Sequence, residues 1–232
     1  MNDLLEVLRQ AITLLLERDS ATWEITRLSL YVSGAALGLS TVAGLPLGAL
    51  LALRSFRGRR LLVALIYTGM GLPPVAVGLC VYLLLSRSGP LGDLEWLFTP
   101  QAMILAQTII SLPVVAGLTM TSIQGADPAL RVQLRALGAS PLQVTMALLW
   151  EVRSGVLVAL IAGFGAIISE VGAVMLVGGN IAGSTRVLTT AIVLETRKGQ
   201  FDLALALTFV LLALTFAINM GTLLLQQRLT RR

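Results

Sequence analysis

Few side chains in this sequence combine the types and the spacing that chemistry needs. The chain has no histidine and a single cysteine, Cys80, so it offers neither the commonest general base nor a cluster of metal-binding thiolates. Glu170 is the only acidic residue deep within an apolar run. Because no nucleophile is paired with a base, the sequence predicts that the protein is not an enzyme and holds no metal or cofactor.

Glu170 lies in the run "IISEVGAVMLVGGNI". An ionisable residue within a membrane span is costly in lipid and is therefore a functional candidate. A carboxylate would repel an anion, so a structural role is favoured over direct ligation. In that role Glu170 would pair with a buried donor or with backbone amides near a helix kink.

A polar segment follows, "GGNIAGSTRVLTTAIVLETRKGQFD". It predicts a short, non-spanning helix near residues 185–195, where Arg186, Thr189 and Thr190 could present hydrogen-bond donors to a passing anion. Asn180 joins these residues as a fourth candidate, and an ordinary solvated loop is the alternative. The glycine spacing of residues 178–185 is that of a phosphate-binding loop, but Ser184 stands where that loop needs lysine. Any energy from ATP must therefore be supplied by a partner chain.

The elements that would position these residues are apolar helices. Of the 232 residues, 56% are hydrophobic and 12% are charged, and mean hydropathy is +0.87, whereas a soluble domain is about a quarter charged. Several runs reach the roughly 20 residues that cross a bilayer. The sequence predicts an all-α, polytopic membrane protein with five transmembrane helices, near residues 25–53, 61–86, 101–123, 154–177 and 203–225. Pro73 and Pro74 should kink or break the second.

Residues 3–18 read as an amphipathic helix, with apolar side chains on one face and polar ones on the other. We expect it to lie in the membrane interface or against other helices, with a sixth span as the alternative. The expected domains are thus an interfacial helix at residues 1–20 and a transmembrane domain at residues 21–232, which includes a polar loop at residues 124–153.

The basic residues lie at the ends of the apolar runs, so the net charge of +5 indicates topology and not a nucleic-acid partner. If the segment "RSFRGRR" is cytoplasmic, alternation of the spans places the N-terminus outside and the C-terminus inside. The cytoplasmic side then holds Arg54, Arg57, Arg59, Arg60, Arg131, Arg135, Arg153, Arg228, Arg231 and Arg232. The opposite side holds Arg9, Arg18, Arg27, Arg87, Arg186, Arg197 and Lys198.

The polar loop predicts two short helices around a turn. Asp127-Pro128 can start the first helix and Gly138 ends it. Ser140 is a good N-cap, and Pro141 suits the first position of a second helix over residues 141–149. The pair would form an element that protrudes on the cytoplasmic side, and an interfacial connector is the alternative.

The loop "RALGASPLQVTMALLWEV" resembles the coupling loop of ABC-importer permeases. Gly138, Ala139-Ser140-Pro141 and Leu148 match the family pattern, whereas Val132-Gln133-Leu134 replaces its Glu-Ala-Ala and Trp150-Glu151 replaces its Leu-Pro. The resemblance implies a type I ABC importer permease whose loop docks on a separate ATPase subunit, which hydrolyses ATP. The implied coupling residues are Arg135, Leu137, Gly138, Ala139, Ser140, Pro141 and Leu142.

Two further segments point to the substrate class. "SEVGA" resembles "SEFGA" of molybdate- and sulfate-type permeases, and the segment from Gly178 onward resembles permeases of tungstate importers. The resemblance implies an inner-membrane permease for an oxyanion, most of all tungstate, with molybdate or sulfate as alternatives. It also implies alternating access, an extracytoplasmic binding protein and a second copy of the chain. A membrane scaffold or receptor, the alternative from another class, would leave the coupling loop unexplained.

Overall fold

The computed structural model describes residue 9 and residues 20–230, and these are helical or irregular with no strand among them. The expected helix at residues 3–18 lies outside the described residues except for Arg9. Three helices are long and apolar enough to cross a membrane: α2 (Ser20–Leu53), α5 (Pro100–Gln124) and α11 (Phe201–Thr230). They confirm the first, third and fifth predicted spans, and Pro113 lies inside α5 as expected.

Helices α2 and α5 form the centre of the bundle. Gly48 allows their close approach, because a Cβ at this position would lie 2.5 Å from the carbonyl oxygen of Ala116. Ser40 and Ser111 hydrogen-bond to each other across the same interface. Gly34 and Gly38, earlier in α2, have open space where a Cβ would be, whereas Gly44 lies against Val115 of α5.

The second predicted span is two helices. Helix α3 (Arg59–Met70) and helix α4 (Pro74–Leu85) meet at an angle of 106°. Pro74 occupies the first helical position of α4. A proline is tolerated there because the backbone amide at this position has no partner within the helix in any case, while Pro73 cannot continue α3. The proline pair therefore breaks this span outright.

The fourth predicted span, residues 154–177, is wrong as a continuous helix. Helix α8 (Arg153–Ile168) ends before Glu170, and a seven-residue helix, α9 (Gly172–Gly178), follows. On its other side, α8 meets α7 (Pro141–Glu151) at 74°. Each bent pair, α3 with α4 and α7 with α8, has the length and composition of one span, so the described residues contain three to five spans.

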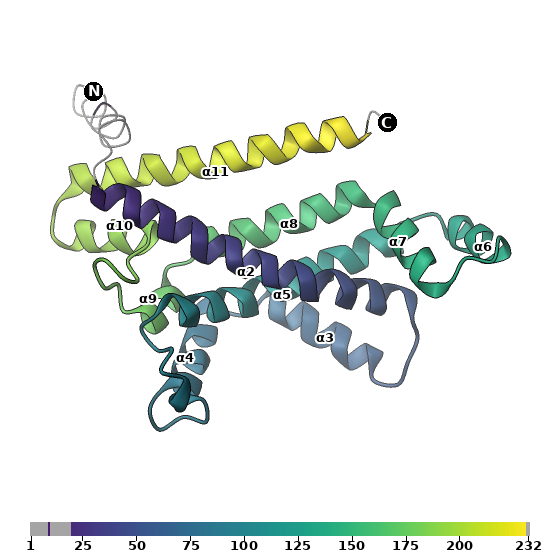
Figure 1. Ribbon diagram of the computed structural model, residues 1–232, viewed down its shortest axis with the longest axis horizontal. Helices are drawn as coiled ribbons and strands as arrows, with labels where there is room; N and C mark the ends of the chain where they lie inside the picture. The colour runs from purple at the N-terminus through teal and green to yellow at the C-terminus, as the bar shows by residue number, and fades with distance from the viewer. Residues whose placement is uncertain (1–8, 10–19, 231–232) are drawn as a thin grey trace.

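The remaining elements lie at the two ends of the bundle. A 3-10 turn, η1 (Gly92–Leu94), follows α4. The short helix expected near residues 185–195 is α10, which spans Leu188–Arg197. Figure 1 shows the end of α2, helix α6 (Pro128–Ala136), α7 and the end of α11 at one end of the molecule. The start of α2, α10 and the start of α11 lie at the other.

Candidate functional site

The polar loop forms two capped helices around a left-handed turn. The carboxylate of Asp127 accepts a hydrogen bond from the amide of Ala129 and caps α6. Gly138 has φ of 82°, a conformation that disfavours residues with a Cβ. The hydroxyl of Ser140 and the side chain of Gln143 then form a reciprocal capping box at the start of α7. The local structure predicted for this loop is confirmed.

Helix α7 presents an apolar stripe to the surroundings. Leu142, Met146 and Trp150 follow each other at four-residue spacing, and each is more than half exposed. Leu137, in the turn, is 85% exposed. Val144 and Leu148 of the same helix are buried, so α7 is anchored by one face and free on the other. An exposed apolar patch of this kind indicates a contact with another protein or with the membrane.

Two arginines tie this end of the molecule to the last turn of α2. The guanidinium of Arg131, in α6, donates to the carbonyl oxygen of Leu53 at 2.7 Å, and that of Arg59 donates to Leu51 at 2.7 Å. Both bonds satisfy carbonyls that the helix itself leaves without partners. Arg131 and Arg135 also line a cavity of about 530 Å³ between α2, α5, α6 and α7.

Glu170 lies in the non-helical segment between α8 and α9. One of its carboxylate oxygens accepts a hydrogen bond from the amide of Ala173, in the first turn of α9, at 2.9 Å. This is the contact with a backbone amide near a helix kink that the sequence favoured. The side chain is partly exposed, so the carboxylate is not enclosed by its own chain.

Side chains from two other helices stabilise the break between α8 and α9. The amide nitrogen of Gln107, on α5, donates to the carbonyl oxygen of Ile167 at 3.0 Å, which also accepts the amide of Glu170 at 3.2 Å. The hydroxyl of Thr189, on α10, donates to the carbonyl oxygen of Glu170 at 3.0 Å. Backbone groups freed inside a membrane must find such partners, and here they come from α5 and α10.

The break between α3 and α4 and the break between α8 and α9 lie side by side. A Cβ at Gly172 would lie 2.5 Å from Cγ2 of Val75, and one at Gly78 would lie 2.6 Å from Cα of Ala173. The start of α4, after the first break, therefore packs on the start of α9, after the second. Discontinuous helices that meet inside a membrane are a recurrent setting for transport sites.

The segment between α9 and α10 makes most of its polar contacts within itself. Asn180 has φ of 53°, its side-chain nitrogen donates to the carbonyl oxygen of Thr190, and its own carbonyl accepts from Arg186, both at 3.4 Å. Thr190 is buried, and its hydroxyl donates to the carbonyl oxygen of Val187. The structure thus brings Asn180, Arg186 and Thr190 together, and it places Thr189 apart from them, against Glu170.

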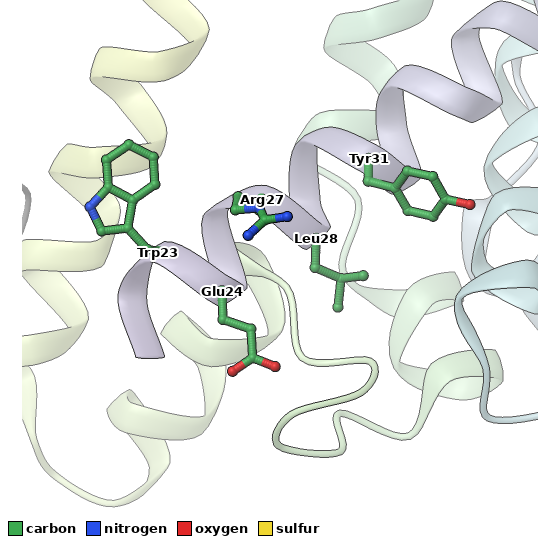
Figure 2. A pocket seen from close by; sticks show the side chains of 5 residues that line it. All are labelled: Trp23, Glu24, Arg27, Leu28 and Tyr31. Carbon is green, nitrogen blue, oxygen red and sulfur yellow. The ribbon is translucent and has the colours of Figure 1, made fainter. Parts of the chain in front are cut away.

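The N-terminal part of α2 carries charged and aromatic side chains on one surface. Trp23, Glu24, Arg27, Leu28 and Tyr31 share one face of the helix and border a cavity of about 460 Å³ (Figure 2). Tryptophan and tyrosine are typical of the level at which a membrane meets water. Residues 28–53 carry no charge and span about 39 Å as a helix, somewhat more than the apolar core of a bilayer. The stretch between Arg27 and Arg54 is therefore long enough to cross a membrane.

Sequence reasoning missed three contributors to these sites. Gln107 and Arg131 act on backbone carbonyls that are far away in the sequence, and no local pattern reveals such a partner. The stripe of Met146 and Trp150, by contrast, follows a four-residue spacing that could have been found. No group of histidine, cysteine or acidic residues in the described part of the chain could hold a metal ion.

Comparisons with known proteins give the family. Residues 44–232 match the family model described as binding-protein-dependent transport system inner membrane component. The chain is 47% identical over 200 residues to a probable anion ABC transporter permease protein of Haloferax volcanii, covering 84% of this chain and 86% of the relative. It is 39% identical to the tungstate uptake system permease protein TupB of Peptoclostridium acidaminophilum, covering 94% of this chain and 96% of the relative.

Solved structures show the same fold. A chain of the inward-facing MetNI methionine ABC transporter has a TM-score of 0.75 at 18% identity, with 90% of this chain and 94% of that chain covered. A chain of a bacterial ABC transporter involved in the import of alginate has a TM-score of 0.73 at 19% identity, with 94% and 82% covered. The family model that matches residues 44–232 shows that the chain belongs to the family of inner membrane components of binding-protein-dependent transport systems.

Proposed function

We propose that the chain is the membrane subunit of an ATP-driven oxyanion importer whose principal substrate is tungstate. The observation that carries this proposal is the similarity to a tungstate uptake permease over nearly the whole length of both chains. Molybdate is the second candidate, because a molybdenum transport permease of Escherichia coli is 27% identical over 90% of this chain. Sulfate is the third.

The proposed complex contains two copies of this chain, two ATPase subunits and an extracytoplasmic binding protein. The chain has no phosphate-binding loop of its own, since Ser184 replaces the required lysine. The apolar stripe Leu142, Met146 and Trp150 supports docking of a partner at α7, because a soluble ATPase can cover apolar side chains that a polar loop cannot. Arg135 and the turn from Leu137 to Pro141 complete the proposed contact surface.

The proposed coupling of the ATPases to the transport pathway depends on how the polar loop is attached to the helix bundle. ATP binding would draw the two ATPases together and push on α7. The bond from Arg131 to Leu53 would pass the motion to α2, and the bend at Val152, between α7 and α8, would pass it to the helix that leads to Glu170. Packed helices transmit such motion as rigid bodies, which turns the pathway from inward- to outward-facing.

The proposed orientation places α6, α7 and the end of α11 in the cytoplasm and the start of α2 outside. Arg54, Arg57 and Arg60 lie at the proposed inner surface, as the positive-inside rule requires. A reporter that is active only in the cytoplasm, fused to the C-terminus, should be active. The same reporter at the N-terminus should be silent.

The proposed pathway lies beside the two helix breaks, with Glu170 at the break of α8 and α9. Asn180 and Arg186 would line its outer part. The hydroxyls of Thr189 and Thr190 donate to backbone carbonyls, so we assign them to shaping the pathway wall in this conformation. A pathway with few charges suits a system in which the binding protein selects the anion.

Uptake measurements in cells test the substrate. A strain without its own tungstate, molybdate and sulfate importers would receive this chain with its ATPase and binding protein, and uptake of labelled tungstate would be challenged with each unlabelled anion. We expect tungstate to compete most strongly. Uptake that sulfate inhibits and tungstate does not would reject tungstate as the substrate.

A further inference from the structure

The position of Glu170 restricts what its side chain faces. The residue lies between α8 and α9, next to the start of α4, and it is partly exposed in the single chain. A carboxylate at this depth does not face acyl chains, because the cost of an ion in hydrocarbon is several kcal/mol or more. The surface that carries Glu170 therefore faces water or a second copy of the chain.

No basic side chain among the described residues forms an ion pair with Glu170. Its carboxylate accepts one hydrogen bond, from the neutral amide of Ala173. Among the described residues the one ion pair joins Lys198 and Glu195, elsewhere in the fold. Val75, which is apolar and 56% exposed, and the carboxylate of Glu170 both lie beside Gly172. Within the described residues, no ion pair therefore balances the charge of this carboxylate.

We propose that Glu170 lowers the affinity of the pathway for its oxyanion and so keeps the pathway from retaining it. The inference rests on the proposed oxyanion transport. A dianion that passes a fixed carboxylate is repelled over several ångströms, and the repulsion is strong where water is sparse. The backbone amide near the break, a group that could otherwise bind an anion, is already occupied by the carboxylate of Glu170. The binding protein then holds the anion tightly and the membrane subunit does not.

Binding of tungstate to the membrane complex tests this role. The chain and its ATPase, in lipid nanodiscs without the binding protein, would be equilibrated with radiolabelled tungstate. We expect the wild-type complex to retain little tungstate and Glu170→Gln to bind it with an affinity about tenfold or more higher. Glutamine can still accept the amide of Ala173, so the break is preserved while the charge is lost.

A second pair of variants separates charge from structure. Val75→Lys leaves Glu170 and its bond to Ala173 in place and adds a neighbouring positive charge, so it should also gain tungstate binding. Val75→Gln is its neutral control and should behave as the wild type does. The proposal is overturned if Glu170→Gln gains no binding, or if Val75→Gln gains as much as Val75→Lys.

Uptake by the wild-type complex distinguishes failure of the role of Glu170 from failure of the proposed transport function. If the wild type transports tungstate with its binding protein and the charge variants gain no binding, the role of Glu170 is rejected and the transport function stands. If the wild type transports no oxyanion, the proposed function fails first.

Discussion

The guanidinium of Arg131 donates to the carbonyl oxygen of Leu53 at 2.7 Å and so joins the protruding loop to the last residue of α2. The two residues are 78 positions apart. The bond connects the element that would receive the push of an ATPase to the helix at the centre of the bundle. It satisfies a helix-terminal carbonyl and is charge-assisted, which makes it stronger than a neutral hydrogen bond.

Replacing Arg131 by alanine should weaken coupling more than it weakens folding. We expect ATP-driven uptake to fall several-fold while the complex still assembles and hydrolyses ATP, so that more ATP is used for each anion carried. The measurement is the ratio of uptake to hydrolysis in proteoliposomes. Arg54→Ala is the matched control, because it removes the same charge at the same end of α2 without this bond. Equal losses in both variants would contradict the role of Arg131.

A negative charge in the apolar stripe of α7 should weaken binding of the ATPase. Leu142→Asp places a carboxylate on a surface that we expect to be buried on docking, which costs several kcal/mol unless the charge is paired. Affinity for the ATPase, measured by titration in detergent, should fall by at least tenfold. Gln133→Glu adds the same charge to an exposed position of α6 and should have little effect. Unchanged affinity in Leu142→Asp would remove this stripe from the interface.

The turn at Gly138 offers a test of backbone geometry alone. Its φ is 82°, and no atom lies within 4 Å of a Cβ built there, so Gly138→Ala should cost only the left-handed conformation, about 1 kcal/mol. We expect weaker coupling with almost no change in melting temperature. Gly58 has φ of 91° and the same open surroundings, so Gly58→Ala pays the same backbone cost outside the loop. Normal uptake in Gly138→Ala would show that the turn geometry is dispensable.

The bond from Gln107 to Ile167 should contribute modestly to stability. Gln107→Leu removes it, but the carbonyl of Ile167 keeps its bond from the amide of Glu170. Hydrogen bonds between membrane helices are worth about 0.6 kcal/mol on average and about 1.7 kcal/mol at most. We therefore expect a loss of about 1 kcal/mol in the free energy of unfolding, measured by detergent denaturation. A loss of several kcal/mol would mean that the break depends on Gln107 far more than its contacts indicate.

The local features of the loop could be predicted from sequence because they depend on neighbouring residues. Asp127, Gly138 and Ser140 act within three residues of their own positions, and the structure has the expected caps and turn. Hydropathy likewise located the three long helices. Pro73 and Pro74 indicated a break, since proline acts on the turn that contains it.

The sequence indicated a kink near Glu170 but not a full interruption of the fourth span there, because the break is stabilised by distant groups. Residues 154–177 have the composition of one helix, and no proline marks the interruption. The freed carbonyls of Ile167 and Glu170 are satisfied by Gln107 and Thr189, from helices α5 and α10. Of the four candidates Asn180, Arg186, Thr189 and Thr190, only Thr189 has a partner of this kind, the carbonyl of Glu170, whereas the other three bond within their own segment.

ATP-driven uptake of tungstate into proteoliposomes tests the central claim most directly. The vesicles would contain this chain with its ATPase, with the binding protein and tungstate outside and ATP inside. The proposed function requires uptake that stops when ATP, the ATPase or the binding protein is omitted. Uptake that proceeds equally well without ATP or without the ATPase, or no oxyanion uptake by the complete system, would contradict it.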